Sequence, residues 1–121
     1  MSETGNHRNL VAWQESMKLA EMVYHGTAQF PREELYGLAA QMRRSAVSVP
    51  SSIAEGAGRN SSKELIQFVG IANGSLVELE TQLELAVRLG YLNTDAECIQ
   101  QVARVGKLLV GLRKSLRERS A

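Results

Sequence analysis

Apolar residues recur at steps of three and four along most of the chain, which is the period of amphipathic helices. This pattern predicts a first helix over about residues 9–28, with the core stripe Leu10, Trp13, Met17, Ala20 and Tyr24. A second helix is predicted from Pro31, with the core stripe Leu35, Ala39, Met42, Ala46, Val49 and Ile53. The second stripe continues through Pro50, so we expect a bend there but no interruption, and an end at Gly56 and Gly58.

The clearest helical repeat of apolar residues lies in the second half of the chain. Ser61 and Glu64 have the spacing of a capping box at the start of a third helix, and Gly90 is expected to end that helix in a left-handed conformation. The core stripe of the third helix consists of Leu65, Val69, Ala72, Leu76, Leu79, Leu83 and Ala86. The core stripe of a fourth helix consists of Cys98, Val102, Val105, Leu109, Leu112 and Leu116.

The sequence contains no segment with the two-residue period of a β-strand. Four amphipathic helices joined by short connections predict an all-α fold, an antiparallel up-down-up-down four-helix bundle roughly 35 to 40 Å long. We expect residues 9–121 to form a single domain, and residues 1–8, which lack the pattern, to form a flexible N-terminal tail.

Composition and charge narrow the class of protein. The 121 residues are 44% apolar and 22% charged, which is the balance of one globular domain. The 14 Lys and Arg residues and the 13 Asp and Glu residues leave a net charge of +1, so attraction to nucleic acid would depend on where the charges lie. The single cysteine excludes an internal disulfide, and no apolar run is long enough to span a membrane. We therefore expect a cytoplasmic protein with no membrane partner.

Residues that could carry out catalysis are few and scattered. His7 and His25 have no cysteine or carboxylate beside them at the spacing of metal ligands. Cys98 falls on the core stripe of the fourth helix, where a lone cysteine is usually an unreactive buried thiol. Glu80 and Glu84 share a helix face, but they lie away from the core stripe and have no acid or base partner. We predict no catalytic site, no cofactor and no metal ion.

The segment from Glu55 to Lys63 has an unusual composition, with two glycines, two serines and two basic residues. One interpretation is an anion site, because the segment leads into a helix N-terminus and Arg59 and Lys63 would add positive charge. The other is that the glycines only end one helix and the serines begin the next. A nucleotide-binding P-loop is excluded, because no strand precedes the segment and its sequence has no Gly-Lys-Ser.

A second set of small and apolar residues lies outside the core stripes of the last two helices. Glycine inside a helix costs up to about 1 kcal/mol relative to alanine, so Gly70 and Gly74 should serve a purpose. They fall almost opposite the core stripe of the third helix and would leave a notch in its surface. We predict that the chain associates with itself through this outer surface, with the interface residues Ile66, Gly70, Gly74, Val77, Gly106 and Val110.

The charges are unevenly distributed along the predicted bundle. In this topology the end of the fourth helix lies beside the start of the third, so basic residues from both should form one pole. The opposite pole should be acidic, with Glu33, Glu34 and Asp95 among its residues. The alternative interpretation is that the basic residues at the end of the fourth helix only complement the dipole of that helix. The candidate nucleic-acid-binding residues are Arg59, Lys63, Arg113, Lys114 and Arg117.

Several short motifs occur together in this chain: Leu35-Tyr-Gly-Leu38, Gln41-Met-Arg-Arg-Ser45, Ile53-Ala-Glu-Gly56 and Ile71-Ala-Asn-Gly-Ser-Leu76. In this combination the chain resembles the four-helix-bundle family of 23S rRNA intervening-sequence proteins over roughly residues 9–115. It is also similar to bundle proteins that accompany retroelements and bind nucleic acid. The resemblance implies a homo-oligomeric ring, a pentamer, and a pairing of Glu55 with an arginine. The residues that match the family motif are Arg43, Arg44, Glu55, Gly56, Gly58 and Arg59.

Two hypotheses about function follow. The first is a non-enzymatic homo-oligomeric bundle that binds structured RNA or a ribonucleoprotein through its basic poles. The alternative is a protein-interaction scaffold whose ring recruits another protein and has no role with nucleic acid. Retention on RNA that decreases steeply with salt would distinguish the first hypothesis from the second.

Overall fold

The computed structural model describes residues 6–120 of the chain. It contains four α-helices, which are α1 (Val11–Thr27), α2 (Leu38–Ala57), α3 (Ser62–Arg88) and α4 (Glu97–Ser120). Two short 3-10 helices, η2 (His7–Asn9) and η3 (Arg32–Glu34), precede α1 and α2 respectively. The described residues include no strand. The prediction of an all-helical protein with four helices is therefore confirmed.

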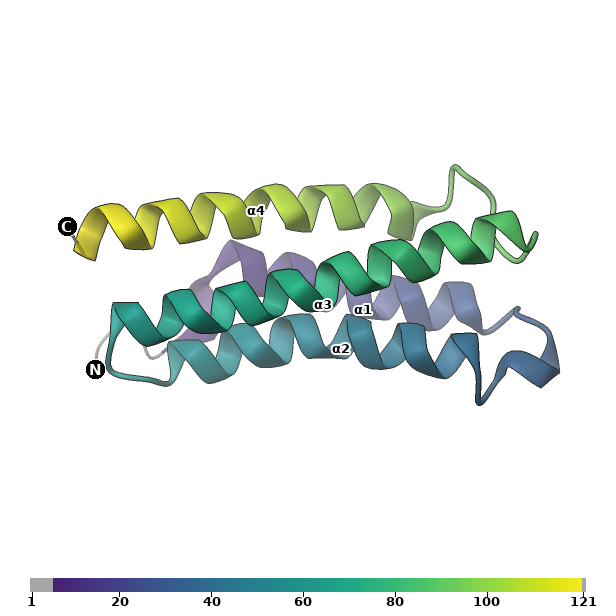
Figure 1. Ribbon diagram of the computed structural model, residues 1–121, viewed down its shortest axis with the longest axis horizontal. Helices are drawn as coiled ribbons and strands as arrows, with labels where there is room; N and C mark the ends of the chain where they lie inside the picture. Colours follow the sequence, from purple (N-terminus) through teal and green to yellow (C-terminus); the bar gives the residue numbers. More distant parts are fainter. Residues whose placement is uncertain (1–5, 121) are drawn as a thin grey trace.

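The four helices lie along one axis and pack as a bundle (Figure 1). Helices that are adjacent in the sequence pack side by side, and α4 packs back on α1. The α1/α2 and α3/α4 faces therefore lie on opposite sides of the bundle. One end of the bundle, which we call the terminal end, holds the start of α1, the turn between α2 and α3, and the end of α4 (Figure 1). The other end, the loop end, holds the two remaining connections.

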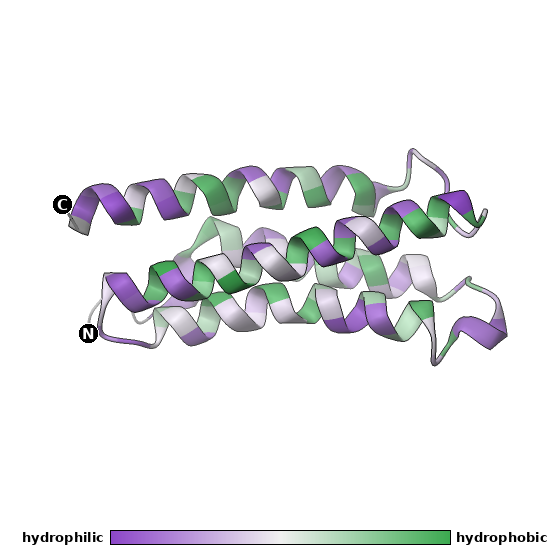
Figure 2. Cartoon of the chain, in the orientation of Figure 1, coloured by the Kyte–Doolittle hydropathy of each residue, from purple (hydrophilic) through white to green (hydrophobic). Residues whose placement is uncertain are grey.

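Apolar positions alternate with polar ones along each helix, and the apolar ones form the core (Figure 2). The predicted stripe of α3 is buried in full, and that of α4 is buried except for half-buried Leu112. The predicted stripe of α2 is buried from Ala39 to Ile53. Leu35, which was predicted to belong to that stripe, is 45% exposed. It lies in the turn after η3, three residues before α2 begins, so the helical period does not extend to it.

The predicted core stripe of α1 is wrong by one residue. Of the predicted stripe, Met17 and Tyr24 are 40% and 46% exposed, whereas Leu10, Trp13 and Ala20 are half-buried and pack against the core. The buried stripe consists of Ala12, Ser16, Leu19 and Val23, each one position earlier, which is a rotation of about 100° around the helix. Ser16 is tolerated inside because its hydroxyl donates to the Trp13 carbonyl at 2.9 Å.

The ends of α3 follow from local sequence chemistry as predicted. The Ser61 hydroxyl accepts a hydrogen bond from the Glu64 amide at 3.3 Å at the start of α3. Gly90 has φ +81°, and the Gly90 and Tyr91 amides donate to Val87 and Ala86, which forms a Schellman motif. These contacts fix where α3 begins and ends, and therefore where its outer face lies along the bundle.

The predictions for Pro50 and for the start of the chain have different outcomes. Helix α2 continues through Pro50, as its apolar stripe predicted. Of the predicted tail, residues 1–5 lie outside the described residues, whereas His7–Asn9 form a 3-10 turn that the Asn6 side chain caps. The tail is therefore described only at its last three residues.

Candidate functional site

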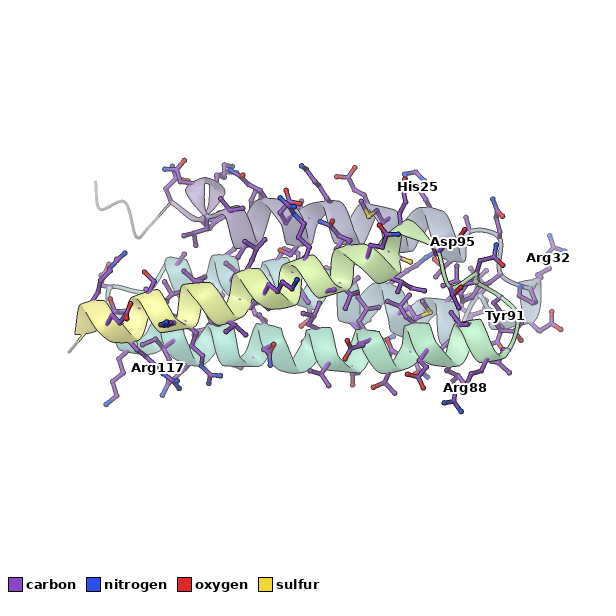
Figure 3. All side chains as sticks on the ribbon, turned by 90° about the horizontal axis from the view of Figure 1, so that it is seen from above. His25, Arg32, Arg88, Tyr91, Asp95 and Arg117 are labelled. Carbon is purple, nitrogen blue, oxygen red and sulfur yellow. The ribbon has the colours of Figure 1, made fainter. Side chains whose placement is uncertain are left out.

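The terminal end of the bundle carries exposed basic side chains from two helices. Lys63 lies in the first turn of α3, and Lys114 and Arg117 lie in the last turns of α4. Figure 3 shows Arg117 at this end and Arg32, Arg88, Tyr91 and Asp95 at the opposite end. The structure therefore brings these three predicted residues to one end of the molecule. The acidic residues predicted for the other pole lie at the loop end, on η3 and in the connection before α4.

Arg59 is engaged by its own surroundings. Its guanidinium donates to the Glu55 carboxylate at 3.2 Å and lies 5.2 Å from the centre of the Phe68 ring. The pairing of Glu55 with an arginine, which the resemblance implied, is confirmed. The contacts of Gly58 and Ser61 in the same segment are those of the capping interpretation, because Gly58 ends α2 and Ser61 begins α3.

Gly56 has a packing role between α2 and α3. A Cβ atom at this position would lie 2.5 Å from the Phe68 Cβ and 3.0 Å from the Leu65 Cδ1. A Cβ atom essentially never lies within 3.0 Å of an atom of a distant residue, so only glycine lets α3 approach α2 this closely at the terminal end. This close approach places Phe68 where Arg59 stacks on it.

Arg113 differs from the other candidate cations because it is half-buried against α3. Its Nη2 would lie 3.2 Å from a Cβ at Gly70, so the absence of a side chain there makes room for the guanidinium. The Arg113 Nε is buried and has no hydrogen-bond partner among the described residues. The notch predicted at Gly70 is thus occupied by Arg113, whereas Gly74 has nothing within 4 Å of its Cβ position.

An apolar groove runs along the α3/α4 face next to Arg113. It encloses about 470 Å³, and its lining includes Val77, Gly106 and Val110 from the predicted interface. Val77 and Val110 are 51% and 65% exposed and project from the surface. Ile66, the remaining apolar residue of the predicted interface, is half-buried and packs against the core. The described residues thus place three of the predicted interface positions on one groove.

A second apolar groove lies between α1 and α2 and was not predicted. It encloses about 580 Å³ and is lined by the apolar or aromatic side chains of Trp13, Met17, Tyr24, Val47 and Pro50, by three small residues, and by the polar side chains of His7, Glu21 and His25. The sequence analysis missed it because it placed the α1 residues in the core. The signal that could have indicated it is Val47, an apolar residue outside the core stripe of α2.

The two motif arginines of α2 have different environments. The Arg43 Nε donates to the Thr27 hydroxyl at 2.8 Å, and its Nη2 donates to the Tyr24 carbonyl at 3.4 Å. Its guanidinium also lies 4.8 Å from the centre of the Tyr24 ring. Arg43 therefore binds the C-terminal turn of α1, where a positive charge is favourable. Arg44, in contrast, is exposed on the outer edge of α2.

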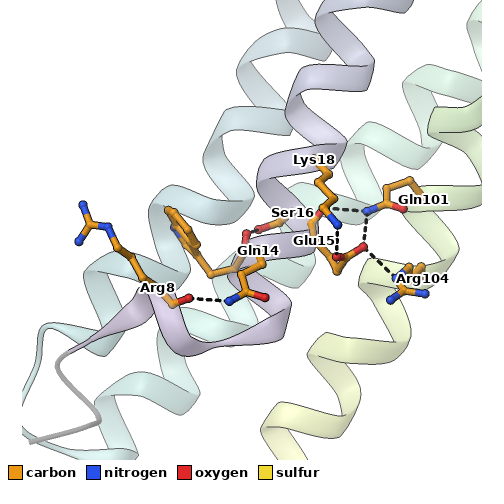
Figure 4. Close-up of polar contacts among 8 residues, drawn as sticks. Arg8, Gln14, Glu15, Ser16, Lys18, Gln101 and Arg104 are labelled. Atoms are coloured by element: carbon orange, nitrogen blue, oxygen red, sulfur yellow. Dashed lines mark hydrogen bonds and ion pairs between the residues drawn. The ribbon is translucent and has the colours of Figure 1, made fainter.

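A buried carboxylate joins α1 to α4 (Figure 4). Glu15 accepts hydrogen bonds from the Gln101 Nε2 at 3.1 Å and the Arg104 Nε at 2.9 Å, and pairs with Lys18 at 3.0 Å. The hydrogen bond from Gln101 and the bond and charge of Lys18 lower the pKa of Glu15 from 4.5 to about 2. These three donors occupy both oxygens of the carboxylate, which joins α1 to α4 through Gln101 and Arg104.

The part of the chain that the structure describes contains few side chains suited to catalysis or metal binding. Cys98 is buried, and this burial raises the pKa of its thiol. Among residues 6–120, no three His, Cys, Asp or Glu side chains come together as a metal site would require. None of the described helices combines the length and apolar character needed to cross a membrane.

Comparison with known proteins assigns the family. No protein with a curated description matches the sequence. Residues 8–111, which include all of α1, α2 and α3 and more than half of α4, match the family described as 23S rRNA-intervening sequence protein. The chain therefore belongs to the 23S rRNA-intervening sequence protein family.

Proposed function

We propose that this protein is a non-enzymatic homo-oligomeric ring of antiparallel up-down-up-down bundles that binds structured RNA or a ribonucleoprotein at its terminal ends. The observation that carries the proposal is the separation of charge along the bundle. Lys63, Lys114 and Arg117 are exposed at one end, without an ion pair among the described residues. The family name, which refers to ribosomal RNA, supports an RNA-related role.

Assembly is needed for this charge to be effective. A single chain has a net charge of +1, so its acidic end offsets its basic end at distances beyond a Debye length of about 8 Å. In a ring with the terminal ends on one rim, several weak basic sites would act together at high effective concentration. A pentamer, the state that the family resemblance implies, would bring five such ends together.

The mode of recognition follows from the scarcity of aromatic residues, which make up 5% of the chain. Tyr36, at 91% exposed, lies in the turn between η3 and α2. At the terminal end, Phe68 is half-buried against the Arg59 guanidinium and Trp13 is half-buried beside His7. Bases would therefore find little free aromatic surface for stacking beside Lys63, Lys114 and Arg117. We expect contacts with phosphates and helix shape, with little preference for sequence.

The test replaces the three exposed cations by neutral residues of similar size. We expect Lys63→Gln/Lys114→Gln/Arg117→Gln to weaken binding to a structured RNA about tenfold or more at roughly 50 mM salt. The dependence on salt should also become shallower, by about one unit of slope for each cation that no longer neutralises a phosphate. Fluorescence anisotropy with a labelled hairpin measures both quantities, and light scattering checks that the oligomer is retained.

The matched control is Lys18→Gln/Arg32→Gln/Arg88→Gln, which also changes the net charge from +1 to −2 but leaves the terminal end intact. It should retain most of the RNA affinity. Equal losses in the two variants would contradict the proposal, because they would show that total charge matters and its position does not. An oligomeric wild-type protein that fails to bind RNA at low salt would also contradict it.

The apolar α1/α2 groove favours the second candidate function, a scaffold that recruits another protein. The groove is lined mainly by apolar side chains, which suit a protein surface better than a phosphate backbone. An oligomer without RNA affinity would leave this function as the better explanation.

A further inference from the structure

We propose that a small pocket at the loop end binds a carboxylate that is carried by a short, branched apolar group. The pocket encloses about 240 Å³ between the last turn of α1, η3 and the first turns of α2. It lies at the end of the bundle opposite the exposed cations that we propose for RNA binding. The inference therefore concerns a separate site and does not depend on that function.

The walls of this pocket are positively charged, although the loop end as a whole is acidic. Arg32 and Arg43 line the pocket, and no carboxylate does. Figure 3 shows Arg32 at the edge of the loop end. The adjacent Glu33 and Glu34 lie outside the lining, and Glu34 accepts a hydrogen bond from the Leu38 amide at 3.2 Å. A ligand in the pocket would therefore meet two cations and no anion on its walls.

Arg43 is held in one orientation by the end of α1. Its Nε donates to the Thr27 hydroxyl at 2.8 Å, and that hydroxyl donates to the Val23 carbonyl at 2.7 Å. Its Nη2 donates to the Tyr24 carbonyl at 3.4 Å, and the guanidinium lies over the Tyr24 ring. Within residues 6–120, Nη1 has no hydrogen-bond partner and Arg43 forms no ion pair. A half-buried guanidinium with unused donors and no counter-charge is suited to bind a carboxylate.

The rest of the pocket wall is largely apolar and selects the group that carries the carboxylate. Phe30 and Ala39 are buried, and Pro31 is half-buried. Leu35 is exposed, so a ligand that fills the pocket would cover an apolar side chain that the chain itself leaves open. Two of the sequence motifs thus meet in one pocket, the first through Leu35 and the second through Arg43.

The size of the pocket limits the class of ligand. With about 30 Å³ for each group the size of a water molecule, 240 Å³ accommodates about eight non-hydrogen atoms. The branched acid 4-methylpentanoate has this number of non-hydrogen atoms. So do the Cα atom, the side chain and the carboxylate of a C-terminal leucine. The same chemistry therefore has two sources, a free branched acid and the C-terminal residue of a protein.

The test measures binding of 4-methylpentanoate to the wild-type protein by saturation-transfer difference NMR, which detects weak ligands of large proteins. We expect a dissociation constant of about 1 mM, because a ligand of this size makes few contacts. The neutral 4-methylpentanamide has the same shape without the charge, so it should bind about tenfold more weakly.

N-acetyl-L-leucine, which mimics a C-terminal residue, distinguishes the two sources of the ligand. Binding tighter than that of 4-methylpentanoate assigns the pocket to the C-terminus of a protein. Weaker binding assigns the pocket to a free acid.

Two variants show whether the ligand occupies this pocket. Leu35→Glu adds a carboxylate to the exposed wall, which repels the ligand and competes for the arginines, so binding should weaken about tenfold. Arg43→Lys keeps the charge but loses the planar fork and its bonds to Thr27 and Tyr24, so a similar loss is expected. Arg44→Gln is the matched control, because Arg44 is exposed on α2 outside the pocket, and it should leave binding unchanged.

Circular dichroism at 222 nm checks that each variant keeps its helices. Should Arg43→Lys unfold, Leu35→Glu still tests the pocket from an exposed position. The inference would be overturned by a wild-type protein that does not bind 4-methylpentanoate well above the expected dissociation constant. Equal binding of the acid and the amide, or undiminished binding by folded Leu35→Glu, would also overturn it.

Discussion

Replacing Gly56 by alanine tests whether the close approach of α2 and α3 determines the stability of the terminal end. The new Cβ would lie 2.5 Å from the Phe68 Cβ, 3.0 Å from the Leu65 Cδ1 and 3.2 Å from the Phe68 Cγ. Rotating the leucine side chain relieves one contact. The Phe68 Cβ is bonded to the backbone, so no side-chain rotation can relieve the shortest one, and α2 and α3 must separate.

The magnitude follows from two opposing terms. Overpacking of this kind costs about 1 to 3 kcal/mol. Alanine in place of glycine inside a helix returns up to about 1 kcal/mol. Because no side-chain rotation relieves the shortest contact, we take the upper part of the overpacking range, about 2 to 3 kcal/mol, so the net destabilisation expected for Gly56→Ala is about 1 to 2 kcal/mol. With an unfolding entropy of about 2.1 cal/mol/K per residue, this corresponds to a Tm lowered by roughly 4 to 8 °C for a chain of 121 residues.

Gly74→Ala is the matched control in the neighbouring helix. Gly74 is exposed inside α3 with nothing within 4 Å of its Cβ position, so alanine should raise the Tm by roughly 4 °C. Both variants are compared by thermal unfolding in a Val110→Glu background, so that subunit association does not contribute. If Gly56→Ala were as stable as its parent, the close packing at the terminal end would not be the reason for the glycine.

Two further predictions concern α1 and α2. Because the pKa of Glu15 is lowered to about 2, its ionised form contributes stability that is present above pH 4.5 and lost as the pH falls toward 2. The difference in urea midpoint between wild type and Glu15→Gln should therefore shrink across that range, and a constant difference would contradict the network with Gln101 and Arg104. Pro50→Ala should preserve or increase the dichroism at 222 nm, because the apolar stripe of α2 continues through the proline; a collapse of helix content would show that Pro50 is needed for folding.

The sequence was sufficient to predict α3 and insufficient for α1, for a physical reason. Every residue of the α3 stripe is apolar and buried, so the hydrophobic period alone identifies the inner face. In α1 the inner face contains Glu15 and Ser16, whereas the apolar Met17 and Tyr24 are exposed. The partner that satisfies Glu15 is Gln101, which is 86 positions away in the sequence, so no local pattern could reveal that the carboxylate is buried.

The sequence predicted the basic residues at the terminal end, but it did not predict the contact of Arg113 with Gly70 or the α1/α2 groove. Helix topology alone placed Lys63 beside Arg117, because the end of α4 must lie near the start of α3 in such a bundle. The insertion of Arg113 over Gly70 depends on the facing angles of α3 and α4, which a single sequence does not specify. The α1/α2 groove was missed for the same reason that the α1 stripe was shifted by one residue.

The shifted stripe of α1 also bears on assembly. A helix at the surface of a monomeric bundle needs one apolar stripe, and the opposite face should be polar. Helix α1 buries Ala12, Ser16, Leu19 and Val23, whereas Trp13, Met17 and Tyr24 form a second stripe at helical spacing on the groove side. Large apolar side chains gathered around a hollow mark a contact surface, unlike apolar residues exposed singly. The sequence pattern that misplaced the core of α1 therefore identifies a face that we expect a protein partner to cover.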